Sequence, residues 1–327
     1  MNERIRSMIA TALTKMFGLA HPIVLAPMGG VSGGSLAAAV SNAGGLGLVG
    51  GGYGDPAWIR TELSRVKEET RRPWGIGVIT WSIERSVLKL SLGYQPDAFM
   101  LSFGDPRPYA PAIKAAGCKL ICQVQDVEQA GVACDAGADL IVAQGTEAGG
   151  HGGRRATLPL VPAVVDAVAP VPVVAAGGIA DGRGLAAALM LGAHGALIGT
   201  RFYASAEALG QDRAKQCIVA ARGSETARTR VFDIVRGYPW PAGYSGRALR
   251  NRFMERWDGR ESDLERALEA ERAAYQAAAR EGDCDTTVVW AGEAADLITS
   301  VDAATVIVAR MSAEAEAQLR EGGRLAR

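Results

Sequence analysis

His151 stands in a loop whose composition suits acid–base chemistry. It follows the apolar run 140–143 and is surrounded by four glycines, Gly149, Gly150, Gly152 and Gly153. Glycine has no Cβ, so the backbone can take positive φ values and approach a flat ligand closely. An imidazole titrates near neutral pH, and His151 could therefore transfer a proton or bind an anion. The alternative is a flexible surface loop with an incidental histidine.

Two other apolar runs end in residues that suit a phosphate group. Ala176 is followed by Gly177 and Gly178, and Gly199 is followed by Thr200. Glycines expose backbone N–H groups, a helix N-terminus adds positive partial charge, and a threonine hydroxyl adds a donor. We therefore favour a phosphate site here. The alternative is that the glycines only make turns.

Polar and flexible side chains end three of the apolar runs. Gln123 and Gln144 each stand near the end of such a run, where an amide could hydrogen-bond a ligand. Pro27 and Met28 end the first run and could lie against a flat ring. The alternatives are solvated strand ends for the two glutamines and core filling for the methionine.

Strands and helices must position these residues, and the sequence shows apolar runs that alternate regularly with helical patterns. The apolar runs cover 23–28, 46–50, 74–80, 98–103, 119–124, 140–145, 172–178 and 195–200. Helical patterns separate them at 34–42, 56–69, 83–92, 106–116, 127–136, 158–169 and 182–191. Near-continuous apolar strands are typical of a parallel sheet covered by helices. Eight units predict an α/β fold, a (β/α)8 TIM barrel, with an open doubly wound sheet as the alternative.

The strand–helix period stops after Phe202. The segment that follows is polar and charged, with helical patterns and an aromatic, proline-rich stretch at 237–244. We predict a barrel domain at 1–203, a small helical lobe on the substrate side at 204–285, and a C-terminal segment at 286–327 that packs back on the barrel. No distinctive polar set in the lobe indicates the substrate.

Charge and cysteine content exclude several classes of protein. Lys+Arg and Asp+Glu both number 35, so there is no basic field to attract nucleic acid. Five scattered cysteines predict no metal site and no disulfides, and they fit a cytoplasmic location. The charge-free run 17–54 is broken by prolines and glycines, so no membrane span is expected. No apolar segment typical of a signal peptide follows Arg4 and Arg6.

Taken together, the motifs resemble the nitronate monooxygenases, formerly called 2-nitropropane dioxygenases. The resemblance rests on Ala26-Pro-Met28, Ala43-Gly-Gly-Leu-Gly47, Glu147-Ala-Gly-Gly-His-Gly152, Ala176-Gly-Gly-Ile-Ala-Asp-Gly182, Gly199-Thr-Arg-Phe202 and Trp290-Ala-Gly292. The FMN-dependent enoyl-acyl-carrier-protein reductases look similar at the same places.

The resemblance implies that FMN is the cofactor. Its phosphate would lie on Gly177, Gly178, Gly199 and Thr200. The remaining cofactor residues that the resemblance implies are Ala26, Pro27, Met28, Gly77, Gln123, Gln144, Ala148, Gly149, Gly150 and Ala176. The chain departs from the family at two of these positions, since many members have Asn in place of Gly77 and some have Lys in place of Gln123.

The activity that the resemblance implies is oxidation of alkyl nitronates by molecular oxygen to carbonyl compounds and nitrite. His151 would bind the nitro oxygens, or act as the base if a neutral nitroalkane is the substrate. One alternative is an FMN enzyme driven by NAD(P)H that reduces enoyl thioesters or quinones. Another is a non-redox barrel that binds a phosphorylated metabolite. The expected partners are small molecules, and a homodimer stays open.

Overall fold

The main sheet of the protein closes into a barrel. The structure is a computed structural model that describes residues 9–325, so Arg4 and Arg6 lie outside the described part. Eight parallel strands follow the order β1-β9-β8-β6-β5-β4-β3-β2. Two backbone hydrogen bonds of 2.9 Å, from Leu46 N–H to Ile23 O and from Leu25 N–H to Leu46 O, join the two edges of this order. The predicted (β/α)8 barrel is confirmed.

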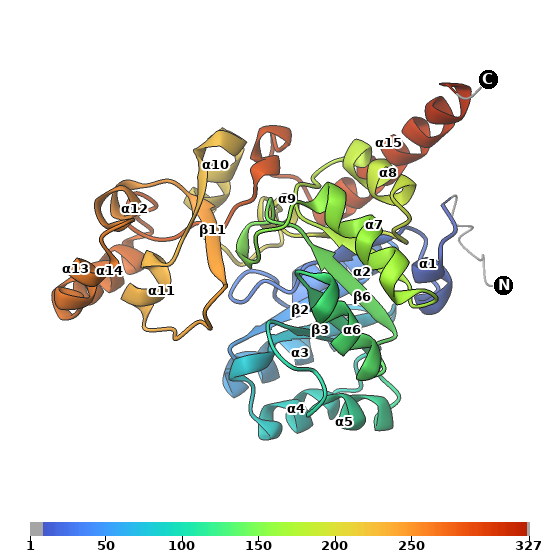
Figure 1. Ribbon diagram of the computed structural model, residues 1–327, viewed down its shortest axis with the longest axis horizontal. Coiled ribbons are helices and arrows are strands. Elements are labelled where there is room, and N and C mark those ends of the chain that lie inside the picture. The colour runs from blue at the N-terminus through green and yellow to red at the C-terminus, as the bar shows by residue number, and fades with distance from the viewer. Residues whose placement is uncertain (1–8, 326–327) are drawn as a thin grey trace.

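Strands and helices alternate around the barrel (Figure 1). The strands are β1 (Ile23–Leu25), β2 (Gly47–Gly52), β3 (Trp74–Ile79), β4 (Ala98–Ser102), β5 (Lys119–Val124), β6 (Leu140–Gln144), β8 (Val173–Ala176) and β9 (Ala196–Ile198). The helices are α2 (Gly34–Asn42), α3 (Pro56–Glu69), α4 (Arg85–Leu92), α5 (Ala110–Ala115), α6 (Val127–Asp135), α7 (Thr157–Val168), α8 (Gly182–Met190) and α15 (Ala304–Leu325). Side chains of Asp55, Asp126 and Asp181 cap α3, α6 and α8, which explains where these helices begin.

Apolar side chains fill the barrel interior. Leu48, Met100 and Val174 are fully buried there, and each such side chain contributes about 1.5–3 kcal/mol through burial. At the N-terminal end of the barrel, α1 (Ala12–Phe17) adds Leu13 and Phe17 to the same cluster. A ligand can therefore enter only from the opposite end, where the C-terminal ends of the strands lie.

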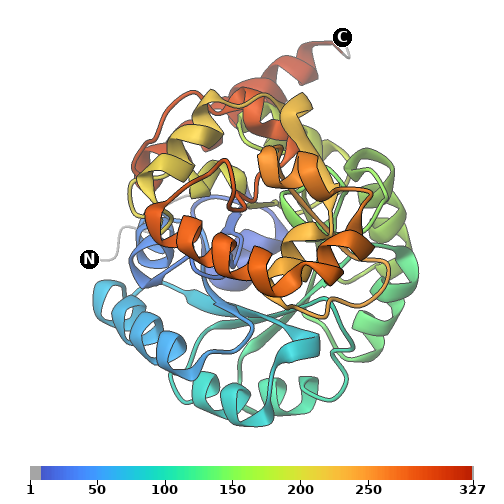
Figure 2. The same cartoon turned by 90° about the vertical axis from the view of Figure 1, so that its left-hand side faces the viewer.

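A lobe is inserted between β9 and α15. We define it by α10 (Asp212–Ala220), β10 (Thr226–Thr229), α11 (Val231–Arg236), β11 (Ser245–Leu249), α12 (Arg252–Trp257), α13 (Glu261–Arg266) and α14 (Leu268–Glu281). Short α9 (Thr200–Tyr203) leads into it. Because α15 packs against both α8 and α2, it takes the place of the eighth barrel helix. Figure 2 shows the lobe helices lying in front of the barrel.

The lobe also contains strands, although the sequence indicated only helices. β10 and β11 pair antiparallel, and β11 pairs antiparallel with β7 (Gly150–Gly152), which belongs to a barrel loop. His151 lies opposite Gly246 in this small sheet. The strands are short and not clearly alternating, and they pair with a distant loop, so no local pattern indicated them. None of the helices within residues 9–325 is both long and apolar enough to cross a lipid bilayer.

Candidate active site

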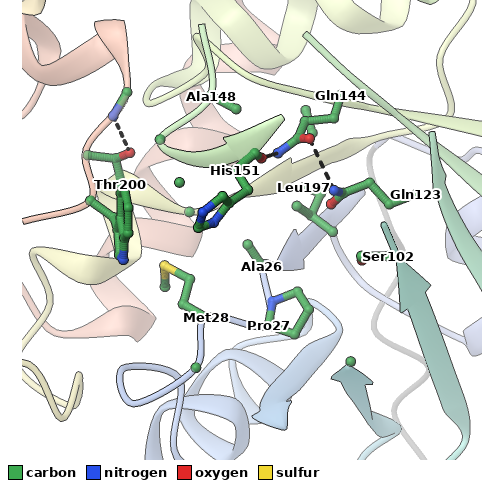
Figure 3. A pocket seen from close by; sticks show the side chains of 18 of the residues that line it. Ala26, Pro27, Met28, Ser102, Gln123, Gln144, Ala148, His151, Leu197 and Thr200 are labelled. Atoms are coloured by element: carbon green, nitrogen blue, oxygen red, sulfur yellow. Dashed lines mark hydrogen bonds between the residues drawn. The ribbon is translucent and has the colours of Figure 1, made fainter. Parts of the chain in front are cut away.

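One cavity collects every residue that was predicted to act in catalysis or to bind the cofactor. It lies at the mouth of the barrel, between the strand ends and the lobe (Figure 3). The predicted residues that line it are Ala26, Pro27, Met28, Gly77, Gln123, Gln144, Ala148, Gly149, Gly150, His151, Ala176, Gly177, Gly178, Gly199 and Thr200. Their roles toward a ligand stay predictions.

The ring of His151 reaches from the barrel loop to the lobe. Its Nε2 atom lies 2.9 Å from Oδ1 and 2.9 Å from Oδ2 of Asp233 on α11. Both side chains are buried, with 8% and 3% of their surface exposed. An ionised carboxylate can only accept hydrogen bonds, so Nε2 carries a proton. Nδ1 has no hydrogen-bond partner among residues 9–325, which leaves it for a ligand.

Burial decides the charge of this imidazole. It lowers the pKa of His151 below the ordinary value of 6.5. The hydrogen bond and charge of Asp233 oppose this effect without reversing it, and the positive charges of Arg236 and Arg228 add to it. The ring is therefore neutral at pH 7, with the proton on Nε2 and the lone pair on Nδ1. That is the form of a general base.

Aromatic rings also pack against the imidazole. Trp240 stacks on His151 with ring centres 3.5 Å apart and planes 5° apart. The indole N–H of Trp240 donates to the Tyr53 hydroxyl at 2.9 Å. Burial raises the pKa of Tyr53 to about 12, so this hydroxyl keeps its own proton at neutral pH. Since Trp240 occupies one face of the ring, a ligand reaches His151 at its edge.

Phe103 adds a strained backbone to the cavity wall. It stands directly after β4 with φ at +64°, in the left-handed region that bulky residues rarely adopt. Such a conformation costs of the order of 1–3 kcal/mol and is typical of functional sites. The Phe103 ring packs edge-on against Trp240, with 5.1 Å between ring centres.

The two predicted glutamines belong to one hydrogen-bonded chain. Gln144 Oε1 accepts from the side-chain amides of Gln123 at 3.1 Å and Gln125 at 3.0 Å. Gln144 Nε2 donates to the backbone carbonyl of His151 at 3.1 Å. Gln144 therefore positions the histidine loop. The side-chain oxygen Oε1 of Gln123 has no hydrogen-bond partner in the described part of the chain, so it is available to a ligand.

Glycines line the opposite side of the cavity with bare backbone. Gly177 and Gly178 have φ values of +102° and +71°, which only glycine adopts without strain. The N–H groups of Gly178 and Gly199 donate to no acceptor within residues 9–325. The hydroxyl of Thr200 accepts from Gly292 N–H at 3.0 Å and keeps its own proton for donation. Two free N–H groups and a hydroxyl form a donor set that suits a phosphate.

The structure explains why Gly77 has no side chain. A Cβ at this position would lie 2.3 Å from Cγ and 2.6 Å from Cβ of Pro27. The proline ring therefore fills the space that an asparagine side chain would need. Here Pro27 forms the cavity wall in place of a polar contact.

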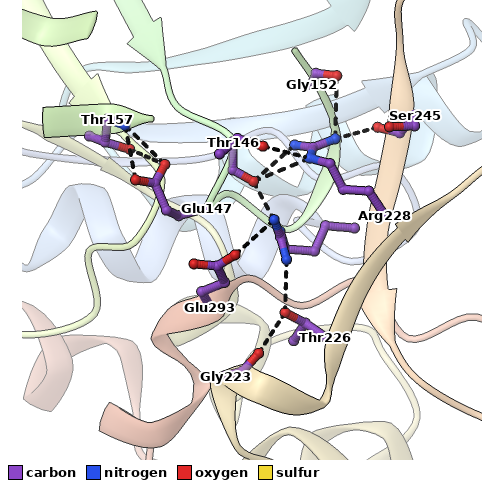
Figure 4. Close-up of polar contacts among 10 residues, drawn as sticks. Thr146, Glu147, Gly152, Thr157, Gly223, Thr226, Arg228, Ser245 and Glu293 are labelled. Atoms are coloured by element: carbon purple, nitrogen blue, oxygen red, sulfur yellow. Dashed lines mark hydrogen bonds and ion pairs between the residues drawn. The ribbon is translucent and has the colours of Figure 1, made fainter. Parts of the chain in front are cut away.

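Two arginines of the lobe tie down the loop that carries His151 (Figure 4). Arg228 donates to the carbonyl oxygens of Thr146 at 3.2 Å and Gly152 at 3.3 Å. Arg247 donates to the Thr146 carbonyl at 3.0 Å and pairs with Glu293 at 2.8 Å. Burial lowers the pKa of Arg228 to about 10, so it remains charged at neutral pH. The lobe thus holds the histidine loop from two strands.

Sequence reasoning missed the polar groups that the lobe contributes. Asp233 bonds His151, and Arg236 lines the same cavity, so the expectation of no distinctive polar set in the lobe is corrected. Neither residue stands in a motif, because α11 is short and its charges look like those of any surface helix. The aromatic stretch that holds Trp240 was the one available signal.

Comparison with solved structures shows which class of protein this chain is similar to. The whole chain is similar to the FabK structure from Thermotoga maritima, with a TM-score of 0.86 and 31% identity over 96% of this chain and 98% of that one. Nitroalkane oxidase from Streptomyces ansochromogenes matches with a TM-score of 0.82 and 30% identity over 95% of this chain and 99% of the other. These matches support a flavin-dependent oxidoreductase.

The family follows from the sequence as a whole. The family described as "Nitronate monooxygenase" matches residues 10–85 and 79–314. A Staphylococcus aureus protein named "Probable nitronate monooxygenase" is 31% identical over 345 residues, which cover 90% of this chain and 94% of that protein. The chain belongs to the nitronate monooxygenase family, whose members are flavin-dependent oxidoreductases.

Proposed function

We propose that the protein uses FMN to oxidise nitronates with molecular oxygen, giving carbonyl compounds and nitrite. The observation that carries this proposal is a glycine-lined cavity that brings together the buried imidazole of His151, held by Asp233, and the cation of Arg236. Atoms balance when two nitronate anions and one oxygen molecule give two carbonyl compounds and two nitrite ions. The flavin, when bound, supplies the electron transfer and the reaction with oxygen.

The glycine side of the cavity fits the phosphate of FMN. The free N–H groups of Gly178 and Gly199 and the hydroxyl of Thr200 support this placement. Gly150 has φ at +72°, and a Cβ there would meet no atom within 4 Å, which leaves room for a flat ring. Pro27 and Met28 would form the wall on the barrel side of that ring.

One charged group, Arg236, supports an anionic substrate, and His151 supports a neutral one. Arg236 lines the cavity with its guanidinium carbon 4.7 Å from the ring centre of Tyr238, and it forms no ion pair with any described residue. An unpaired cation in a partly buried cavity attracts a nitronate. For a neutral nitroalkane, the Nδ1 lone pair of His151 would remove the proton on the carbon that bears the nitro group.

An aerobic assay of the purified holoenzyme tests the proposal. Ethyl nitronate should yield nitrite and acetaldehyde with oxygen consumption, without NADH or NADPH. Chromatography of the denatured protein should release FMN. If nitrite forms only when a nicotinamide nucleotide is added, or not at all, the proposal fails.

A flavin reductase driven by NAD(P)H is the second candidate. The observation that favours it is the match to FabK, whose TM-score of 0.86 exceeds the 0.82 of nitroalkane oxidase. Oxidation of NADH or NADPH that depends on an enoyl thioester or a quinone, in the same preparation, would support this candidate. The family assignment leaves no support for the non-redox barrel.

A further inference from the structure

Aromatic rings concentrate around the substrate side of the cavity. Aromatic residues make up 6% of the chain, yet five of them line this one cavity. We call four of these the aromatic cage: Tyr53, Phe103, Trp240 and Trp290. They come from the loop after β2, the end of β4, the loop between α11 and β11, and the segment before α15. Convergence from four separate segments builds a shaped wall rather than a general apolar core.

The cage is rigid. Tyr53 stacks on Tyr238 with 3.8 Å between ring centres, and its hydroxyl fixes the indole of Trp240. Trp290 tilts against His151 at 5.0 Å, and a Cβ at Gly246 would lie 2.3 Å from the Trp290 ring, so only glycine lets this ring pack there. Rings held in this way offer fixed flat faces and edges to a ligand.

Phe103 contributes its ring to the cage from a strained backbone conformation. Its backbone stands at φ +64°, a conformation that disfavours a bulky side chain. The strained turn points the ring at Trp240, 5.1 Å away, and at Tyr244, 5.4 Å away. Glycine or asparagine would fit the backbone better, so the phenyl ring itself is what the position needs.

The cavity has a polar region, lined by His151 and Arg236, and an aromatic region, lined by Tyr53 and Phe103. The edge of His151 and the guanidinium of Arg236 lie where a nitronate would bind, while Tyr53 and Phe103, both half-buried, leave part of their rings exposed to the cavity. A substrate with an anionic end and a flat apolar end matches this division. A small alkyl nitronate would leave the rings in contact with water.

We propose that the preferred substrates are nitronates that carry an aromatic ring, with the ring in the aromatic cage and the nitronate group toward His151 and Arg236. This inference rests on the proposed function, and the reaction itself is unchanged. Ring contacts of this kind should favour an aryl over a small alkyl substituent by about tenfold in kcat/KM. The nitronate of phenylnitromethane and ethyl nitronate are the substrates to compare.

Binding of two dead-end ligands separates this inference from the proposed function. Nitrobenzene and 2-methyl-2-nitropropane have no hydrogen on the carbon that bears the nitro group, so neither forms a nitronate. Titration of the holoenzyme, followed by flavin absorbance and tryptophan fluorescence, should give a Kd for nitrobenzene about tenfold lower. If this holds while neither nitronate is oxidised, the proposed function fails and the aryl preference of the cavity stands.

Matched variants locate the effect. Trp240→Leu and Phe103→Leu should each weaken nitrobenzene binding about three- to tenfold and change 2-methyl-2-nitropropane binding less than about twofold. Trp257→Leu is the control, because Trp257 is a lobe tryptophan with the same 4% exposure as Trp240 but lies outside the cavity. Phe103→Leu decides the test if Trp240→Leu fails to fold. Equal affinity for both ligands in the wild-type protein, or equal weakening of both in the cage variants, overturns the inference.

Discussion

His151 and Asp233 are 82 residues apart in the chain, and Nε2 of the imidazole lies 2.9 Å from both carboxylate oxygens. This contact links the barrel loop to the lobe. It also selects the tautomer of the histidine, because the carboxylate requires a donor and leaves Nδ1 as the acceptor. The residues proposed to bind the cofactor belong to the barrel and its loops. The lobe contributes Asp233, the carboxylate that fixes the tautomer of His151.

Exchange of Asp233 for Asn should impair the base without emptying the site. We expect kcat/KM for neutral nitroethane to fall about 10- to 1000-fold, because an amide no longer fixes the tautomer. Asp233 raises the pKa of His151, so the pH–rate profile of the variant should also shift toward lower pH. Flavin content and the rate with ethyl nitronate are the controls. An unchanged pH profile would show that Asp233 only packs against the ring.

The pKa of His151 also makes a prediction about stability. The unfolded chain gains a proton on this residue near pH 6.5, whereas the folded protein gains it at a lower pH. Between these two values the unfolded state binds more protons, so the free energy of unfolding should fall as the pH drops below 6.5. Urea denaturation at pH 7.5 and 5.5 should show a smaller pH effect in His151→Gln than in the wild type. Equal losses in both proteins would refute the lowered pKa.

The phosphate placement predicts the behaviour of glycine variants. Gly199 has φ at −105°, and a Cβ there would make ordinary contacts of 3.6 Å with Ala26 and 3.7 Å with Met28. Gly199→Val should therefore fold but crowd the bound FMN, giving mostly colourless protein. Gly178→Val should also lose flavin, but its φ of +71° adds strain, so melting temperature must be measured beside it. Full flavin content in folded Gly199→Val would contradict the proposed position of the phosphate beside Gly199.

Much of the barrel could be predicted because its signals are local. The boundaries of α2 and α3 were predicted to the residue, since an apolar period and a following glycine or polar residue end each helix where the pattern stops. Gln123, Gln144 and Thr200 were predicted to lie together because they stand at strand ends, and the strand ends of a closed barrel must meet. Other cavity residues, such as Gly77 and Ala148, were predicted from the family resemblance. Every one of them lines the same cavity.

The lobe side of the site could not be predicted in the same way. β7 consists of Gly150, His151 and Gly152, and it becomes a strand only because β11 pairs with it. Asp233 acquires its role from a contact across 82 residues, and nothing in its local sequence distinguishes it from a solvated helix residue. Pairing between distant segments depends on tertiary packing. The hydrophobic periodicity of the sequence reports local structure only, so it does not reveal such pairing.

Loss of the imidazole should separate its two roles. His151→Ala should keep FMN but lose turnover of a neutral nitroalkane by about 10²- to 10⁴-fold, the usual contribution of a general base. The loss with a preformed nitronate should be smaller, because that substrate has no proton to remove. An equal loss on both substrates would assign His151 to anion binding, and wild-type rates on both would favour the reductase.

Anaerobic mixing of the holoenzyme with ethyl nitronate tests the central claim most directly. The flavin absorbance should fall within the mixing experiment and return when oxygen is admitted, with nitrite released. Mixing with NADH or NADPH in place of the nitronate should leave the absorbance unchanged on the same timescale. Rapid bleaching by a nicotinamide nucleotide, with none by the nitronate, would contradict the proposed function.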